Sequence, residues 1–143
     1  MGELTVAELL DRDAWAGNPN GFKLGSKFTD ESCIRTLTNC IAYDHGKKGF
    51  DKNNSSCNIS LKNCISFDND INYQLITMNI TNYENIYGWD GKSDDEMADG
   101  YVITVPDGCQ NTENKIRSAG RAMSKFAAQN KIGKTDVFEL FGS

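Results

Sequence analysis

The sequence lacks several features that would assign it to a common functional class. No apolar run in its 143 residues reaches membrane-spanning length, so no transmembrane helix is predicted. The first residues, Met1 to Leu4, are not a basic region followed by an apolar stretch, so no signal peptide is expected here. None of the five cysteines forms a Cys-x-x-Cys pair, which argues against a structural zinc site.

The chain also has no excess of positive charge. Its formal net charge is −5, which argues against nucleic acid as a partner. Residues 21–62 nevertheless contain seven basic and four acidic side chains, giving +3, so the rest of the chain carries −8. Such a basic segment suits a local anionic ligand, and ordinary solvated surface lysines explain it equally well. The basic residues are Lys23, Lys27, Arg35, Lys47, Lys48, Lys52 and Lys62.

What the sequence does contain is an internal repeat. Residues 33–44 and 57–68 align at a constant offset of 24 residues, and a Gly-Phe pair precedes each copy. A weaker third copy begins at residues 72–75 and continues through residues 80–83. Each copy is too short to bury its own apolar face, so the copies are expected to stack. The identical pairs are Cys33/Cys57, Leu37/Leu61, Asn39/Asn63, Cys40/Cys64, Ile41/Ile65 and Asp44/Asp68, and Tyr43/Phe67 is a matched aromatic pair.

The repeat predicts an all-β fold, a parallel β-helix of about three coils. Alternating apolar residues and Asn, Gly and Ser turns indicate short strands rather than helical repeats. Stacked coils place equivalent residues about 4.8 Å apart, so Leu37 would lie over Leu61 and Ile41 over Ile65. The amides of Asn39, Asn63 and Asn82 are expected to form a ladder at a turn. The stacks Cys33/Cys57 and Cys40/Cys64 fall within disulfide range, but buried free thiols are the favoured interpretation.

The two ends of the chain are expected to differ from the repeats. The single predicted domain has an N-terminal cap or remnant (1–14), the coils (15–87), a loop and strand (88–110) and a helical cap or tail (111–143). The polar segment 83–100 is predicted to be a loop, with a surface ion site as a minor alternative. Residues 101–106 are predicted to be a strand. Apolar residues at helical spacing over 114–131 predict an amphipathic helix that packs on the solenoid as a C-terminal capping α-helix.

Three segments carry a resemblance to a known family. Asn-Gly-Phe-Lys-Leu-Gly at 20–25, Ile-Ala-Tyr-Asp at 41–44 and Lys-Gly-Phe-Asp-Lys-Asn-Asn at 48–54 resemble polysaccharide lyase family 9. That family comprises pectate and exopolygalacturonate lyases on right-handed parallel β-helices. The resemblance runs from about Trp15 to Leu75. It implies a secreted or extracellular enzyme acting on an anionic polysaccharide, polygalacturonate or pectin.

The resemblance also implies a mechanism and a set of site residues. A lysine base removes the C5 proton of the uronate, and bound calcium neutralises the adjacent carboxylate. Lys23 matches the base; alternation with Phe22 places it on the outward face of a strand, where an ordinary exposed lysine would also lie. Asp51 would orient Lys23 or the substrate, or tie down a turn. The candidates for binding substrate carboxylates are Lys47, Lys48 and Lys52.

The calcium site implied by the family is not visible in the sequence. The family's ligands are an aspartate cluster on coils before the lysine motif, whereas only Asp11 and Asp13 precede Lys23 here. The metal ligands are therefore unassigned, and without the ion the rate should fall by orders of magnitude. Three interpretations stay open: a truncated lyase that is weakly active or inactive, a non-catalytic β-helix that binds acidic glycans, and a purely structural solenoid.

Overall fold

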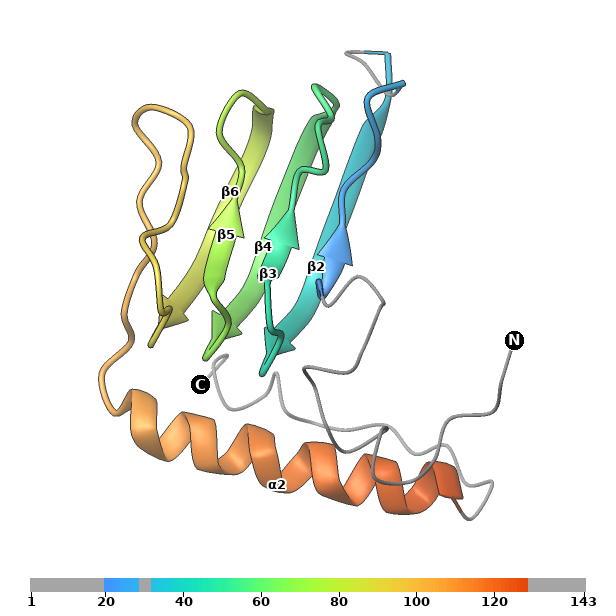
Figure 1. The fold of residues 1–143 in the computed structure, drawn as a ribbon. Coiled ribbons are helices and arrows are strands. Elements are labelled where there is room, and N and C mark those ends of the chain that lie inside the picture. The colour runs from blue at the N-terminus through green and yellow to red at the C-terminus, as the bar shows by residue number, and fades with distance from the viewer. Residues whose placement is uncertain (1–19, 29–31, 129–143) are drawn as a thin grey trace.

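The computed structural model of the protein describes residues 20–28 and 32–128, which form two parallel three-stranded sheets followed by a helix (Figure 1). The chain alternates between the sheets, so that each short strand and the long strand after it make one repeat unit. The units stack in chain order, which is the mostly β, parallel arrangement that the sequence predicted. The short strands are β1 (Phe22–Lys23), β3 (Lys48–Asp51) and β5 (Ile71–Gln74); the long strands are β2 (Ile34–Tyr43), β4 (Asn58–Phe67) and β6 (Asn79–Trp89).

The pairing of β2 with β4 keeps the offset of the sequence repeat. Leu37 pairs with Leu61 and Ile41 with Ile65, which confirms the two predicted apolar stacks. Between β4 and β6 the register shifts after the Ile59/Ile80 pair, because β6 contains one extra residue there. The extra residue forms a bulge-like irregularity, and it displaces every later equivalence in the third unit by one position.

The amide ladder is present, but its third member was predicted at the wrong residue. Asn63 Nδ2 donates to Asn39 Oδ1 at 3.0 Å, and Asn85 Nδ2 donates to Asn63 Oδ1 at 3.0 Å. Asn82 instead pairs with Ser60, because β4 and β6 pair at offsets of 21 and 22 residues rather than the 24 that relates β2 to β4. The three ladder asparagines have φ values of 58°, 53° and 54°, in the left-handed region that asparagine tolerates better than most residues. The ladder therefore marks a sharp bend in each long strand.

Two columns of stacked aromatic rings follow the stacking direction of the repeats. Neighbouring rings in both columns have centroids between 4.8 and 5.1 Å apart and interplanar angles of 18° or less. The glycine that precedes each phenylalanine of the first column is required by close packing, since a Cβ on Gly49 would lie 2.2 Å from Ser66 Oγ. The columns are Phe22/Phe50/Tyr73 and Tyr43/Phe67/Trp89.

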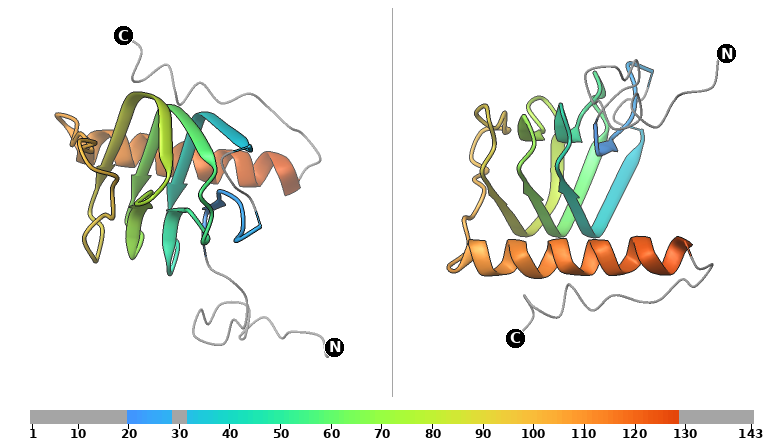
Figure 2. Two further views of the ribbon diagram at one scale, coloured as in Figure 1. Left: turned by 90° about the horizontal axis from the view of Figure 1, so that it is seen from above. Right: turned by 60° about the horizontal axis from the view of Figure 1, so that its bottom comes forward.

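Helix α2 (Cys109–Ala128) lies across the C-terminal ends of the three long strands (Figures 1 and 2). Ile116 is 2% exposed and packs with Phe67 and Trp89, so the apolar stripe of the helix faces the strands. The helix begins before the predicted start at residue 114. It extends along the side of the stack rather than over one of its ends (Figure 2). The described residues contain no helix long and apolar enough to cross a membrane.

Two predictions for the segment after the third repeat were wrong. Residues 83–89 belong to strand β6 rather than to a loop. Residues 101–106 do not form a strand: Thr104 alone bridges to β6, its N–H donating to Ile86 O at 3.0 Å. The segment after Tyr83 has a polar composition typical of a loop, because the exposed positions of β6 carry Glu and Asn. The predicted N-terminal cap, with Asp11 and Asp13, and the helix end at residues 129–131 lie outside the described residues.

Candidate active site

The Asn-Gly-Phe-Lys motif is fixed to the next repeat by the side chain of its first residue. Asn20 Nδ2 donates to Asp51 Oδ2 at 3.0 Å, and Asn20 Oδ1 accepts the N–H of Lys48 at 2.8 Å. The main chain adds a further bond, from Gly21 N–H to Lys48 O at 2.9 Å. Asn20 therefore holds both ends of β3, and it was not among the predicted site residues although it begins the motif.

Asp51 is a buried carboxylate whose charge is balanced within the same cluster. It is 4% exposed, and its Oδ1 accepts the N–H of Asn53 at 2.9 Å. Lys48 Nζ lies 3.6 Å from the same oxygen, close enough for an ion pair. A buried carboxylate is stable only when it is hydrogen-bonded or paired, and Asp51 is both. Of the two roles predicted for it, these contacts most directly serve the tying down of the turn.

Lys23 is exposed beside this cluster. It pairs in register with Asp51 across β1 and β3, while Phe22 stacks on Phe50 and Leu24 is 2% exposed. The outward orientation predicted from alternation is therefore present. Among the described residues no carboxylate lies within ion-pair distance of Lys23, because Asp51 is taken up by Asn20 and Lys48. The amine is left facing solvent next to a rigid, neutralised support.

The other lysines predicted for substrate binding are distributed along β3 and its C-terminal end. Lys48 is half-buried and pairs with Asp51. Lys52 follows the strand, and its Nζ donates to Thr77 Oγ1 of the next repeat at 3.2 Å. Lys47 is exposed and precedes β3, so it lies at the opposite end of that strand. The structure thus brings Lys23, Lys48 and Asp51 together, with Lys52 next to them and Lys47 apart.

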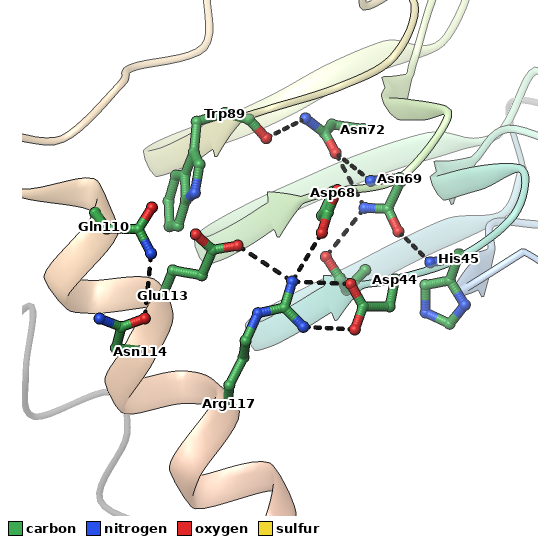
Figure 3. A network of polar contacts seen from close by, with 11 residues as sticks. Asp44, His45, Asp68, Asn69, Asn72, Trp89, Gln110, Glu113, Asn114 and Arg117 are labelled. Carbon is green, nitrogen blue, oxygen red and sulfur yellow. Dashed lines mark hydrogen bonds and ion pairs between the residues drawn. The ribbon is translucent and has the colours of Figure 1, made fainter.

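A second polar cluster joins helix α2 to the strand ends (Figure 3). Arg117 Nη1 and Nη2 contact the carboxylate of Asp44 at 2.5 and 2.9 Å, and Nη2 contacts Asp68 at 2.8 Å and Glu113 at 3.1 Å. The hydrogen bonds with Asp44 raise the pKa of Arg117 above its usual value. The guanidinium also lies over the rings of Tyr43 and Phe67, at 5.4 and 5.3 Å.

The Arg117 cluster was not predicted. Its only sequence signal was the repeated aspartate at 44 and 68, because nothing in the sequence indicates which helical cation reaches those carboxylates. All four charged groups are used in contacts with one another, so the cluster serves to attach the helix. A neighbouring buried network extends it: Asn69 Nδ2 donates to Ala42 O at 3.1 Å, and Asn72 Nδ2 donates to Trp89 O at 2.9 Å (Figure 3).

The described residues do not fit a calcium site. Within residues 20–28 and 32–128, no group of three or more His, Cys, Asp or Glu side chains converges as metal ligands would. The acidic loop after β6 is partly committed elsewhere, since Asp95 Oδ1 accepts the N–H of Tyr73 at 2.9 Å and Glu96 accepts from Gln74. The surface ion site considered for that loop therefore finds no support in the described part of the chain.

Comparison with known proteins identifies the architecture. A search of curated proteins found no match, and neither did a search of solved structures. A family described as "Pel9A-like, right handed beta helix region" matches residues 6–92, which is more than half of the chain and includes all six strands. The match agrees with the partial resemblance to pectate lyases of polysaccharide lyase family 9. The chain belongs to the Pel9A-like family of right-handed β-helix regions.

Proposed function

We propose that this protein is a pectate lyase-like module that cleaves polygalacturonate by β-elimination, with Lys23 as the base. The observation that carries the proposal is the position of Lys23 in a β-helix of this family. It is exposed on β1, and the carboxylate nearest to it in register is already neutralised. A lysine base has to give up its proton before it can act, and a free carboxylate beside it would oppose that loss.

The reaction needs one proton acceptor at the substrate. Nζ of Lys23 removes the proton from C5 of a galacturonate residue, and the electron pair forms a double bond between C4 and C5. The C4–O bond breaks, and the departing glycosidic oxygen takes up a proton from water; the hydroxide left behind removes the proton from Lys23 Nζ, which restores the base. No water is added across the bond, so the product carries an unsaturated uronate, which distinguishes this reaction from hydrolysis.

The neighbouring lysines are proposed to bind the uronate carboxylates. Lys48 and Lys52 are the strongest candidates, because both lie at β3 next to Lys23. Lys47 would contact a sugar farther along the chain, since it precedes the strand. Asp51 is proposed to fix the orientation of Lys48 and the β1 backbone. Its side chain accepts a hydrogen bond from Asn20 Nδ2, and its main-chain oxygen accepts the N–H of Leu24 at 2.8 Å.

Calcium remains part of the proposal as the family resemblance implies, although the described residues do not supply a site for it. Its ligands would come from outside these residues or from another chain. A module without them is expected to be weakly active or inactive. We further propose that the three repeat units form three coils of a secreted β-helix. The predicted role of the helix as a cap is not retained in this proposal, because α2 lies along the side of the stack and not over its end.

The test is an ultraviolet absorbance assay for unsaturated uronate, using the full chain and polygalacturonate with and without added calcium. The wild type and a Lys92→Ala control should form equal amounts of product, at a low rate for a module that lacks the calcium ligands, and Lys23→Ala should form none; no product from the folded wild type would favour the second candidate below. Lys92 is a suitable control because it is an exposed lysine in the loop after β6. Equal product from Lys23→Ala and the wild type would contradict the assignment of the base.

A non-catalytic protein that binds acidic glycans is the second candidate. The observation favouring it is the lysine cluster on and around β3 combined with the lack of a convergent metal site among the described residues. Retardation in gels containing polygalacturonate, without product, would support this candidate. Lys48→Ala and Lys52→Ala should then reduce retardation, whereas Lys62→Ala should not, because Lys62 lies on the other sheet, 4.0 Å from Glu84.

A further inference from the structure

Two cysteines occupy equivalent positions on adjacent strands. Cys40 of β2 and Cys64 of β4 are register partners, and each directly follows a ladder asparagine with positive φ. Their side chains therefore point in the same direction from neighbouring backbones. Neighbouring strands lie about 4.8 Å apart, which is within the Cα separation of about 4.4–6.8 Å that disulfides adopt. Both residues are free thiols in this structure.

The two thiols differ in exposure and acidity. Cys64 is fully buried, whereas Cys40 is only partly buried and can be reached from solvent. A hydrogen bond between the two side chains lowers the pKa of the Cys40 thiol to about 7. The same hydrogen bond, reinforced by burial, raises the pKa of Cys64. Cys40 is thus the nucleophilic member of the pair, and Cys64 holds a proton beside it.

The remaining cysteines do not combine these properties. Cys57 is also stacked on a cysteine, Cys33, but it is fully buried, and burial raises the pKa of its thiol. Its Sγ donates to the main-chain oxygen of Cys33 at 3.0 Å, and the two residues precede the paired segments of β2 and β4, which begin at Ile34 and Asn58. Cys109 begins helix α2 and packs near Trp89 and Ile116. Proximity, access and an acidic thiol coincide only at Cys40 and Cys64 among the described cysteines.

We propose that Cys40 and Cys64 form a dithiol site that exchanges with low-molecular-weight disulfides and closes into a disulfide joining β2 to β4. The thiolate of Cys40 attacks one sulfur of the small disulfide, its S–S bond breaks, and one thiolate leaves. Cys64 then gives up its proton, its sulfur attacks Cys40 Sγ, and the second small thiolate leaves. The small disulfide is reduced to two thiols while the protein dithiol is oxidised. This proposal does not rest on the proposed lyase activity.

The test treats the folded full chain with oxidised glutathione and maps the products by peptide mass spectrometry. The expected product is an intramolecular Cys40–Cys64 disulfide, lighter than the reduced protein by two hydrogen atoms. Cys64→Ser should instead accumulate a glutathione adduct on Cys40, because the attacking second thiol is missing. Cys40→Ser should form neither product, and the Cys109→Ser control should behave as the wild type does.

A second readout follows the acidity of Cys40. In the wild type, the rate of its alkylation by iodoacetamide should rise with pH through a midpoint near 7, whereas Cys57 should react only after unfolding. Circular dichroism identifies any variant that fails to fold. If a variant does not fold, the pH dependence of Cys40 alkylation in the wild type replaces it as the test of the acidic thiol. A disulfide mapped to another pair, a stable adduct on Cys40 of the wild type, or no reaction of the folded wild type would each overturn the proposal.

Discussion

The Arg117 cluster and the Asp51 cluster neutralise aspartates of stacked strands in opposite ways. Asp44 and Asp68 have side chains 33% and 45% exposed, and they share one guanidinium supplied by a helix far away in the sequence. Asp51 is buried and is held by Asn20 from the preceding repeat and by Lys48 from its own repeat. The first arrangement ties two parts of the fold together, whereas the second stabilises a local turn.

The difference bears directly on function. At the helix, every charged group of the cluster is engaged, so no side chain is left to act on a ligand. At β1, the local neutralisation of Asp51 leaves Lys23 exposed without a carboxylate partner among the described residues. We infer that the repeat provides the scaffold on both sides, and that acid–base chemistry on an anionic substrate is expected at Lys23, where the scaffold leaves a charge uncompensated.

The largest expected effect is on the helix side. Arg117→Met keeps the stem that covers the aromatic rings but removes the charge, leaving Asp44, Asp68 and the buried Glu113 without a cation. We expect the free energy of unfolding in urea to fall by about 3 kcal/mol. Arg121→Met is the control, because Arg121 is exposed and its Nη2 contacts only Ser118 Oγ on the same helix. Equal losses from the two variants would show that the cluster does not hold the helix.

An intermediate effect is expected at Asp51. Asp51→Asn removes the ion pair with Lys48 and places an amide group against the donors of Asn20 and Asn53. The free energy of unfolding should fall by about 2 kcal/mol, and any lyase activity should fall as well because Lys48 loses its anchor. Glu84→Gln, on an exposed pair, should change neither urea unfolding nor product formation measurably. An Asp51→Asn variant as stable as the wild type would show that the charge of Asp51 does not stabilise the turn.

The smallest loss of stability is expected in the amide ladder, where two variants of Asn63 distinguish the contribution of the hydrogen bonds from that of the backbone geometry. Asn63→Gly loses two amide contacts but accepts a φ of 53°, and we expect about 1 kcal/mol of destabilisation. Asn63→Ala loses the same contacts and also forces an alanine into the left-handed region, which should cost about 1 kcal/mol more. Thermal or urea unfolding of both variants provides the comparison. Identical stabilities would mean that the bend is not strained.

The sequence predicted those features that the repeat itself encodes. The stacks Leu37/Leu61 and Ile41/Ile65 follow from identical residues at one constant offset, and the outward position of Lys23 follows from strand alternation. The third unit does not follow the offset of 24 residues that relates β2 to β4: residues of β4 and β6 pair at an offset of 21 before the irregularity and 22 after it, so the ladder is completed by Asn85 and not by the predicted Asn82. An offset established from two copies does not predict the different offset of the third.

Long-range contacts could not be predicted in the same way. Helical periodicity indicated that α2 has an apolar face, but the position of the helix depends on Ile116 packing with Phe67 and on Arg117 reaching two aspartates. Neither contact leaves a spacing signal in the sequence. The role of Asn20 was visible only as part of a motif, since its two hydrogen bonds reach residues 28 and 31 positions away.

Lys23 is tested most directly as the base by product formation from a Lys23→Met variant, which keeps the length of the side chain and removes the amine. Binding and absorbance are measured together, with polygalacturonate in excess and calcium present. We predict that the variant still binds polygalacturonate through Lys48 and Lys52, as judged by gel retardation, and releases no unsaturated uronate while the wild type does. Unsaturated product formed by Lys23→Met at the wild-type rate would contradict it.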